Sequence, residues 1–531
     1  MKNIVNNIKT QFIFIMMFAL MLSACDNIQN EFDNTQINNK VQLTQSEINI
    51  LHSMRNGCSN RISLDEATKI ANEVIGFLDN ETTTKSGNSR QISSITTLKS
   101  ERENMVMTKS VSYGGNENAE DLDTLAYLIN FADSAGYTII AAYTRVENPI
   151  LCYTGSGTLG DTSDNSGIAI FLQGAESYIK RSIVETQAAR DSLLNDILAK
   201  IKDTGVSDTT YVVDDGTITK AIPSGPVNTI PDEISVSHSF GPWTVYENVE
   251  PLLSVEWGQF APFNAVIPKS CSDNSGGKAP VGCVAVATSY ILTYWLNKKS
   301  TILTLDGYVF DSNLLCKYTC NPERYAGAGI YNINASSNEA NTARSQIARL
   351  LERIGSRIGM DYGCDGSGAD ISDGVKFLNN LWFTGETSGK NYNFNDVKNS
   401  LLQERPVMIE GFAEKDTFLG ISFLYTLKQG HAWVIDGYLK RKQIDNATVT
   451  VTSYQTQSNG MIMIINTTTN EIYTTYSPYY LHNNWGNYYN NGYYVEGAFD
   501  FCNGPDLTSN TKSYEEGNFQ YNNKIYPNIY F

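Results

Sequence analysis

Histidine is scarce in this sequence, which has four in 531 residues, and no two of them lie close together. Structural zinc sites often use two histidines about four positions apart, so the pair Cys316 and Cys320 has no histidine half-site to complete it. We therefore expect neither a metal nor another cofactor. We interpret the two cysteines as structural, with a disulfide as an option in an oxidising compartment. The four histidines are His52, His238, His431 and His482.

Basic residues are also few. The chain has 39 Lys and Arg against 56 Asp and Glu, a net charge of -17, and no basic patch, so a phosphate backbone would be repelled and no nucleic acid partner is expected. With 41% hydrophobic and 18% charged residues, the composition is that of a globular protein rather than a disordered one. The length leaves room for several domains.

Long apolar runs are absent except for one short segment at the N-terminus. Phe12–Leu22 is too short to span a bilayer as a helix, and it follows Lys2 and Lys9, as in an export signal. The next residues, Leu-Ser-Ala-Cys up to Cys25, resemble the lipobox of bacterial lipoproteins, although an ordinary signal followed by a chance cysteine remains an alternative. We expect residues 1–25 to be a lipoprotein-type signal peptide with Cys25 as the lipidated residue.

This interpretation predicts an exported protein of the cell envelope, at the outer membrane or cell surface, with release after processing as a further outcome. No later segment reaches the roughly 18 apolar residues that a transmembrane helix needs, so a lipid anchor would be the only membrane contact. Residues 26–59 are rich in Asn and Gln and poor in large apolar groups, which is typical of a polar tether.

Ordered structure is expected to begin near residue 60. Ser63–Glu66 is a capping box, and apolar residues at helical spacing follow it as far as Asp79. β-rich runs at 124–131 and 136–143 predict a hairpin, and the three- and four-residue spacing over 168–202 predicts long helices. Together these elements predict a compact α+β unit over residues 60–203.

Residues 204–244 have the composition of a linker, with four prolines and several glycines. Lys220 is the last basic residue before Lys269, which makes it a candidate processing site. A second domain is expected over residues 245–531.

Cys283 occupies a special position in the second domain. Pro280 and Gly282 form a turn, and the apolar segment that follows predicts a buried helix with Cys283 in its first turn. A free cysteine in such a segment is most often a core residue. However, the positive end of the helix dipole favours a thiolate, so this position predicts a nucleophile whose pKa lies below that of an ordinary thiol.

A nucleophilic cysteine needs a base, and His431 in the segment GHAWVIDGY is the candidate downstream of it. A third residue should hold the imidazole. Asp436 is near in sequence, but residues five apart on an unbroken strand point to opposite faces. We therefore favour Asn484, with the neighbouring Trp485 as a cover over the pair.

Six segments, in this order, resemble the motifs of the streptopain family of cysteine peptidases. They are WGQFAPFN (257–264), GCVAVATSY (282–290), IGMDYGCDGSGAD (358–370), RPVMIEGF (405–412), GHAWVIDGY (430–438) and HNNWGN (482–487). The unit at 60–203 is similar to the inhibitory propeptide of that family. The resemblance implies an α+β protein with a papain-like, two-lobed catalytic domain, one lobe helical and the other an antiparallel sheet, preceded by an α+β propeptide domain.

The resemblance also implies roles for individual residues. Cys283 would attack the peptide carbonyl, His431 would act as base and then acid, Asn484 and Trp485 would orient and shield the imidazole, and Gln259 would contribute to an oxyanion hole with the Cys283 N–H. Gln259 and Trp485 could equally be packing residues.

Substrate contacts are implied for Ser367, Gly368, Ala369 and Gly430, although the glycine-rich loop could also be an ordinary turn. The resemblance further implies an apolar pocket for the residue that precedes the scissile one. Two features depart from the family pattern: Gln429 stands where a glycine is expected, and residues 439–480 predict an inserted β-meander of unassigned role.

The sequence thus predicts a secreted or surface-anchored cysteine endopeptidase made as a zymogen, with protein or peptide substrates and an intramolecular propeptide. Two alternatives stay open. One is a transglutaminase-like or amidase enzyme that uses Asp436, and the other is a catalytically silent surface-binding module, for which only the Tyr- and Asn-rich segment 488–531 is available.

Overall fold

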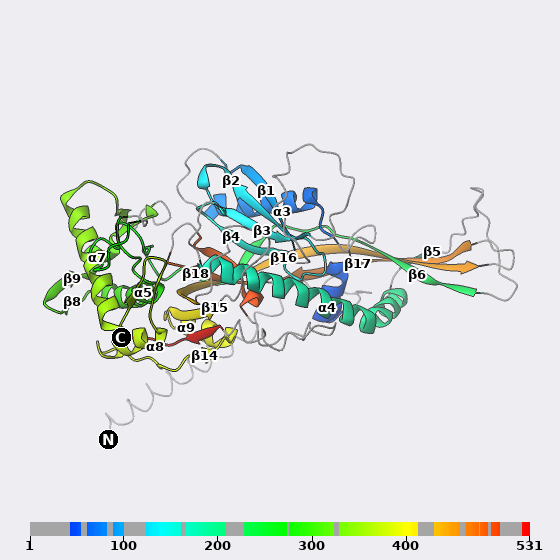
Figure 1. The fold of residues 1–531 in the computed structure, drawn as a ribbon. Helices are drawn as coiled ribbons and strands as arrows, with labels where there is room; N and C mark the ends of the chain where they lie inside the picture. Colours follow the sequence, from blue (N-terminus) through cyan, green and yellow to red (C-terminus); the bar gives the residue numbers. More distant parts are fainter. Residues whose placement is uncertain are drawn as a thin grey trace, which may run out of the picture.

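The computed structural model shows a mixed helix and sheet protein, as the α+β expectation requires (Figure 1). The signal segment with Cys25, the processing candidate Lys220 and Gln429 all lie outside the described residues. No helix in the described ranges is long and apolar enough to cross a membrane. The structure describes residues 43–54, 61–81, 89–99, 124–160, 166–204, 206–208, 228–272, 276–322, 329–412, 430–456, 462–476, 478–486, 490–499 and 523–531.

The N-terminal unit, residues 60–203, packs helix α3 (Leu64–Glu81) on an antiparallel sheet. The predicted start of this helix is confirmed, because the Ser63 hydroxyl accepts the backbone N–H of Glu66 at 3.2 Å. The predicted hairpin is confirmed as well, since its two strands pair antiparallel around a short 3-10 turn. The strands of this unit are β1 (Ile92–Lys99), β2 (Thr124–Phe131), β3 (Tyr137–Ala141) and β4 (Ile150–Thr154).

Helix α4 (Ser166–Thr204) is a single helix of 39 residues where several helices were expected. A helix of this length extends roughly 58 Å at 1.5 Å per residue. Its first turns pack in the core of the N-terminal unit through Ile168, Phe171 and Leu172. Its last turns reach a separate apolar core through Ile197 and Ile201, so one rod connects two distant parts of the molecule (Figure 1).

The sheet of the N-terminal unit continues into the sheet of the C-terminal part. Strand β4 pairs antiparallel with β19 (Gly492–Val495), which places Tyr153 opposite Tyr493. From there the strand order runs β19-β18-β16-β15-β20-β14. The further strands are β18 (Tyr479–Asn484), β16 (Gly430–Thr456), β15 (Val407–Phe412), β20 (Lys524–Tyr526) and β14 (Lys390–Asn391).

Helices cover one side of this C-terminal sheet, with α5 (Cys283–Lys298) at their centre. Twelve of its 16 residues are buried, as the apolar sequence predicts, and it contacts α6, α7 and α8 as well as β15 and β16. The other helices are α6 (Ser312–Cys316), α7 (Asn338–Arg357), α8 (Ile371–Asn379) and α9 (Phe394–Leu402). Short two-stranded pairs flank them: β8 (Ile302–Leu305) with β9 (Tyr308–Asp311), β10 (Tyr318–Thr319) with β11 (Tyr331–Asn332), and β12 (Asp361–Tyr362) with β13 (Ser367–Gly368).

The segment expected as an inserted meander forms a long projecting arm instead. Strand β16 continues far beyond the sheet (Figure 1). Its residues 443–456 pair with β17 (Ile462–Tyr476) along almost the whole length of β17. Part of the expected linker joins this arm, because β6 (Asn228–Ser237) pairs with β16, and β5 (Val206–Asp208) pairs with β17. Nearer the sheet, β7 (Thr244–Val249) also pairs with β16.

A short helix, α2 (Gln45–Ser53), lies within the span expected to be a polar tether. Thr44 and Glu47 form a capping box at its start, so this part of the expected tether is helical. Ile50 and Leu51 are buried against the end of α4 and against Val449 and Val451 of the arm. A helix, a linker strand and the arm therefore share one small apolar core.

A buried ionic cluster lies beside this core. The carboxylate of Asp445 on β16 accepts His238 Nδ1 at 2.6 Å and lies 3.2 Å from His52 Nε2 of α2. His238 Nε2 faces the carbonyl of Met54 at 3.0 Å. The two ring nitrogens of His238 thus face oxygen atoms on β16 and at the end of α2, so the ring connects the arm to this helix. Burial raises the pKa of Asp445, but its hydrogen bonds to the two histidines bring it to about 2.

Asp445→Asn should loosen helix α2 from the arm, because it removes the buried carboxylate that binds both His238 and His52. Breaking a buried pair on one side costs on the order of 3 kcal/mol, which corresponds to a roughly hundredfold faster amide hydrogen exchange in α2. Since the folded pKa is lowered, the carboxylate stabilises the fold above about pH 4 and ceases to do so as the pH falls toward 2.

The matched control is Asp373→Asn, which removes an exposed ion pair with Lys376 on helix α8. That change should alter exchange in α2 by less than about twofold. Equal, small effects of the two substitutions would contradict a structural role for the cluster.

Candidate active site

Cys283 is the first residue of helix α5, and its position depends on Gly282. This glycine has a φ of +94°, and a Cβ there would lie 2.6 Å from the sulfur of Met360. The segment before it is anchored by the Val281 N–H, which donates to the carbonyl of Gln259 at 2.9 Å. The backbone of Gln259 is thus joined to a residue two positions before Cys283, and its side chain is half-buried.

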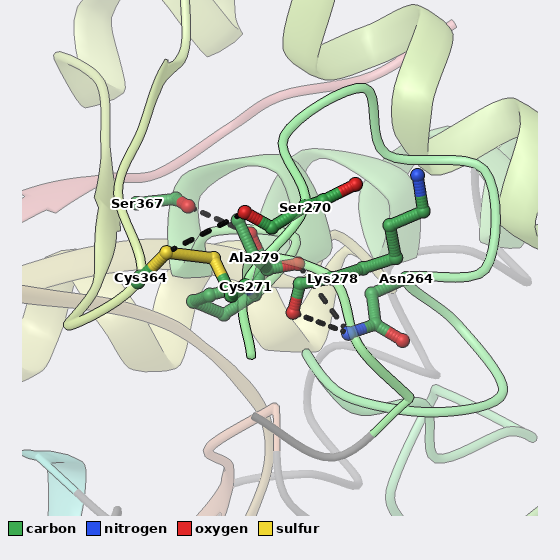
Figure 2. Close-up of a disulfide and its surroundings, with 8 residues drawn as sticks. Asn264, Ser270, Cys271, Lys278, Ala279, Cys364 and Ser367 are labelled. Atoms are coloured by element: carbon green, nitrogen blue, oxygen red, sulfur yellow. Dashed lines mark hydrogen bonds between the residues drawn. A yellow bond between two sulfur atoms is a disulfide. The ribbon is translucent and has the colours of Figure 1, made fainter. Parts of the chain in front are cut away.

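A disulfide and two hydrogen-bonding side chains fix the loops that lead into α5 (Figure 2). Cys271 and Cys364 form the disulfide, with Cα atoms 5.6 Å apart. The Ser367 hydroxyl donates to the carbonyl of Pro280 at 2.7 Å, and the amide of Asn264 donates to the carbonyls of Lys278 and Ala279. These contacts hold the loop that contains Ser367 directly against the entry to the helix.

The disulfide was not anticipated from the sequence. Cys316 and Cys320, for which a disulfide was an option, are both free thiols. Burial raises the pKa of each. Gly368 is exposed and Ala369 half-buried next to Ser367, so this loop presents backbone near the entry to α5, whereas Gly430 is half-buried at the start of β16.

The thiol of Cys283 is half-buried and lies against strand β16. Burial raises its pKa, and the backbone N–H groups of Ala432 and Val284, which donate to the sulfur, only partly offset this effect. The lowered pKa expected from the helix N-terminus is therefore wrong for the full chain. Desolvation of the thiolate outweighs the dipole of the helix in this arrangement.

His431 is 4% exposed and donates from Nε2 to the backbone carbonyl of Trp485 at 2.8 Å. A carbonyl can only accept, so Nε2 carries the proton and Nδ1 carries the lone pair. Burial lowers the pKa of this imidazole to about 4, which keeps it neutral at physiological pH. The geometry thus supplies a neutral base with a fixed tautomer.

Aromatic rings and a glycine surround the imidazole. The His431 ring is stacked with Trp433 at 6.0 Å between centroids and lies 6.4 Å from Trp485. Gly167, in the first turn of α4, lies on top of this cluster. A Cβ at Gly167 would lie 2.3 Å from Trp485 Cε3 and 3.1 Å from His431 Cδ2. The N-terminal unit therefore contacts the imidazole closely, and only glycine fits at that point.

The two sides of strand β16 belong to different cores. Ala432 and Val434 pack with helix α5, whereas Trp433 and Ile435 pack with the N-terminal unit. His431 pairs across the strands with Gly411, where a Cβ would meet Trp433 and Ile170 of α4. The imidazole thus lies on the face of β16 that packs against the N-terminal unit. The sulfur of Cys283 contacts Ala432, whose side chain lies on the opposite face of the strand.

Asn484 lies beside these groups but its hydrogen bonds run elsewhere. Its amide donates to Val255, and its oxygen accepts from Gly486 and from the side chain of Asn491 at 3.1 Å. Asn491 also accepts the Trp485 N–H at 2.8 Å. The carbonyl of Trp485, rather than the amide of Asn484, orients His431 in this structure. No spacing or motif in the sequence singled out Asn491.

Asp436 occupies a bulge between the paired positions Ile435 and Gly437 of β16. Its carboxylate accepts His482 Nδ1 at 2.5 Å and the N–H of Leu253 at 3.1 Å. This arrangement gives no support to an acyl-transfer site in which Asp436 serves His431. Within the described ranges, no three His, Cys, Asp or Glu side chains lie together as a metal site would require.

Comparison with known proteins agrees with the geometry of the site. No curated protein sequence matches the chain. The family model described as the Peptidase C10 family matches residues 257–494, a span that contains Gln259, Cys283, His431, Asn484 and Trp485. Residues 257–494 therefore match the Peptidase C10 family, the streptopain family of cysteine peptidases, whose members are hydrolases.

Proposed function

We propose that this protein is an exported cysteine endopeptidase made as a zymogen, with Cys283 as nucleophile, His431 as base and residues 60–203 as an inhibitory propeptide. The observation that carries the proposal is the contact of Gly167 with His431 and Trp485. Because the first turn of α4 lies on the imidazole, the N-terminal unit covers a group that the reaction needs.

The proposed reaction is acyl transfer to sulfur followed by hydrolysis. Cys283 Sγ attacks the peptide carbonyl as its proton passes to Nδ1 of His431, and the same proton then leaves with the amine as the C–N bond breaks. Water hydrolyses the thioester and restores the thiol. The Cys283 N–H and the side chain of Gln259 would stabilise the oxyanion. Since the imidazole now shares a face with the N-terminal unit, activation includes a turn of His431 toward Cys283.

The division into a helical part around α5 and an antiparallel sheet around β16 supports a papain-like arrangement of two lobes, with the substrate between them. Ser367, Gly368, Ala369 and Gly430 are the proposed backbone-binding positions. Protein or peptide substrates follow from the family.

A buried arginine supports the assignment of the N-terminal unit as an intramolecular partner. Arg441 of β16 is 0% exposed, and its guanidinium carbon lies 3.8 Å from the ring centre of Phe77 and 4.4 Å from that of Tyr153. Both rings belong to the N-terminal unit, and Tyr480 of β18 completes the enclosure. The three guanidinium nitrogens have no hydrogen-bond partner among the described residues, so these aromatic faces are what compensates for the burial of the cation.

Export and anchoring complete the proposal. The segment Phe12–Leu22 and the lipobox-like residues before Cys25 support secretion with a lipid anchor at the cell envelope. Proteolysis within 204–244 would then separate the N-terminal unit from the enzyme.

In the full chain, Cys283 should react slowly with iodoacetamide below about pH 8.5, because the raised pKa keeps it a thiol. After cleavage within 204–244 and removal of the N-terminal fragment, His431 can stabilise the thiolate. Labelling at pH 6 should then rise at least about tenfold, and His431→Ala should abolish that rise. Mass spectrometry of the Cys283 peptide measures both rates. Identical pH profiles before and after removal would contradict the masked dyad.

Gly167→Ala should weaken inhibition in the uncut chain. The added methyl has no room beside Trp485, and overpacking of this kind costs on the order of 1–3 kcal/mol. We expect labelling of Cys283 in the full chain to accelerate by roughly five- to hundredfold, in proportion to that cost. Gly76→Ala is the matched control, since its Cβ would meet nothing within 4 Å in α3. If both variants were labelled at the wild-type rate, Gly167 would not hold the unit over His431.

Maturation should require the nucleophile. A wild-type chain expressed without residues 1–25 should convert itself to a fragment that begins near Ala221, whereas Cys283→Ala should remain full length and be trimmed only by added mature enzyme. Intact-mass measurement over time distinguishes the two. Unaided maturation of pure Cys283→Ala would exclude autocatalytic processing.

A further inference from the structure

An acidic side chain lies on the strand next to the residue that contacts the Cys283 sulfur. Glu410 on β15 is paired across the strands with Ala432, the residue whose N–H donates to the Cys283 sulfur. Its charge adds to the effects that raise the pKa of the Cys283 thiol, so the carboxylate and the sulfur lie within electrostatic range. No role has been assigned above to this residue.

The alternation of β15 directs Glu410 toward the helical part. Met408, two residues earlier, packs in the core around α5, together with its cross-strand partner Val434. The intervening residue Ile409 packs in the core of the N-terminal unit, and a Cβ at Gly411 would meet Ile170 of α4. The Glu410 side chain therefore lies on the same face of β15 as that of Met408, which is the face toward the helical part and Cys283.

The surroundings of Glu410 leave its charge available to a ligand. The Tyr526 hydroxyl donates to one carboxylate oxygen at 3.0 Å, whereas a carboxylate has about four acceptor positions. Two further charged groups act on it: Lys524, its cross-strand neighbour on β20, and Asp370. The side chain is half-buried, so its charge is less screened than that of a surface carboxylate.

Asp370 extends the acidic character along the same side of the site. It is exposed, caps helix α8 through the N–H of Ser372, and directly follows the loop Ser367–Ala369. Asp370 thus lies at the end of the proposed backbone-binding loop and within electrostatic range of Glu410. Lys524 on β20 is a partial counter-ion for Glu410. An apolar substrate side chain placed here would leave the Glu410 carboxylate desolvated without a partner.

We propose that Glu410 is a specificity-determining residue that binds a Lys or Arg side chain of the substrate within two residues of the scissile bond, on its N-terminal side. This inference rests on the proposed peptidase function and replaces the apolar pocket implied by resemblance. Tyr526 orients the carboxylate, and Asp370 strengthens the attraction at the rim. Burial raises the pKa of Glu410, so selection for basic residues should weaken as the pH falls through that raised value.

The test uses the mature enzyme and peptide pairs that differ only by lysine or norleucine at each of the two positions before the scissile bond. Wild type should prefer lysine at one of them by roughly ten- to hundredfold in kcat/KM, the range of a charge-assisted hydrogen bond. Glu410→Gln should abolish or reverse that ratio. Because the ratio compares two substrates on one enzyme, any effect of the substitution on Cys283 itself cancels.

Two further variants sharpen the test. Tyr526→Phe should reduce the lysine preference only in part, and Glu404→Gln, which changes an exposed carboxylate paired with Lys298, should leave it unchanged. A Glu410→Gln enzyme that keeps the wild-type ratio, or a wild type that prefers norleucine, would overturn this inference while the peptidase assignment stands. A mature wild type that cleaves none of the peptides, and does not react at Cys283, would overturn the proposed function and this inference together.

Discussion

Strand β16 is the constraint on which most of this molecule depends. Over Gly430–Thr456 it pairs with β15, β18 and β7 in the body of the protein and with β17 and β6 in the arm. His431 lies near its start, Arg441 in its middle and Asp445 toward its outer half. A shift of one residue in its pairing would move all of these side chains to the wrong face, so the register of one strand fixes the site, the interface and the arm together.

Alternation along this strand also separates the proposed nucleophile from the proposed base. Neighbouring residues point to opposite sides, so His431 and Ala432 belong to two different cores. The imidazole is covered by α4 and the thiol is covered by the strand itself, which leaves both groups uncharged. In the proposed zymogen, inhibition would therefore come from burial of the two groups, which disfavours their charged forms, rather than from a distorted nucleophile.

Local signals in the sequence predicted some parts of the fold well. The capping box at Ser63 and the apolar segment after Cys283 each determine a helix start within a few residues, so both could be read directly. Pairing between distant segments has no such signal. The β4–β19 junction, the pairing of β6 with the arm and the disulfide Cys271–Cys364 join residues that only the folded chain brings together.

The same limit applies to the candidate site. The sequence singled out Cys283 and His431 because their local segments are distinctive, and their catalytic roles stay predictions. The pKa of the thiol depends on what buries it, and that burial is a property of the whole chain. Asn491 lies outside the six segments that resemble the family, and the segment RPVMIEGF that contains Glu410 gave this residue no role. Their positions follow from hydrogen bonding and strand pairing that the sequence does not display.

Helix α4 touches the molecule at both of its ends, at Gly167 over the imidazole and at Ile197 and Ile201 beside the arm. A fragment held at two distant points on one rigid rod behaves as a bivalent ligand, since release of one end leaves the other at a high effective concentration. In the proposed maturation, cleavage of the linker and release of the enzyme would therefore be separate events. After cleavage, the N-terminal unit would stay bound until both ends of α4 dissociate. The delay between cleavage and release would then depend on how fast these two contacts dissociate, and not on the protease that cleaves the linker.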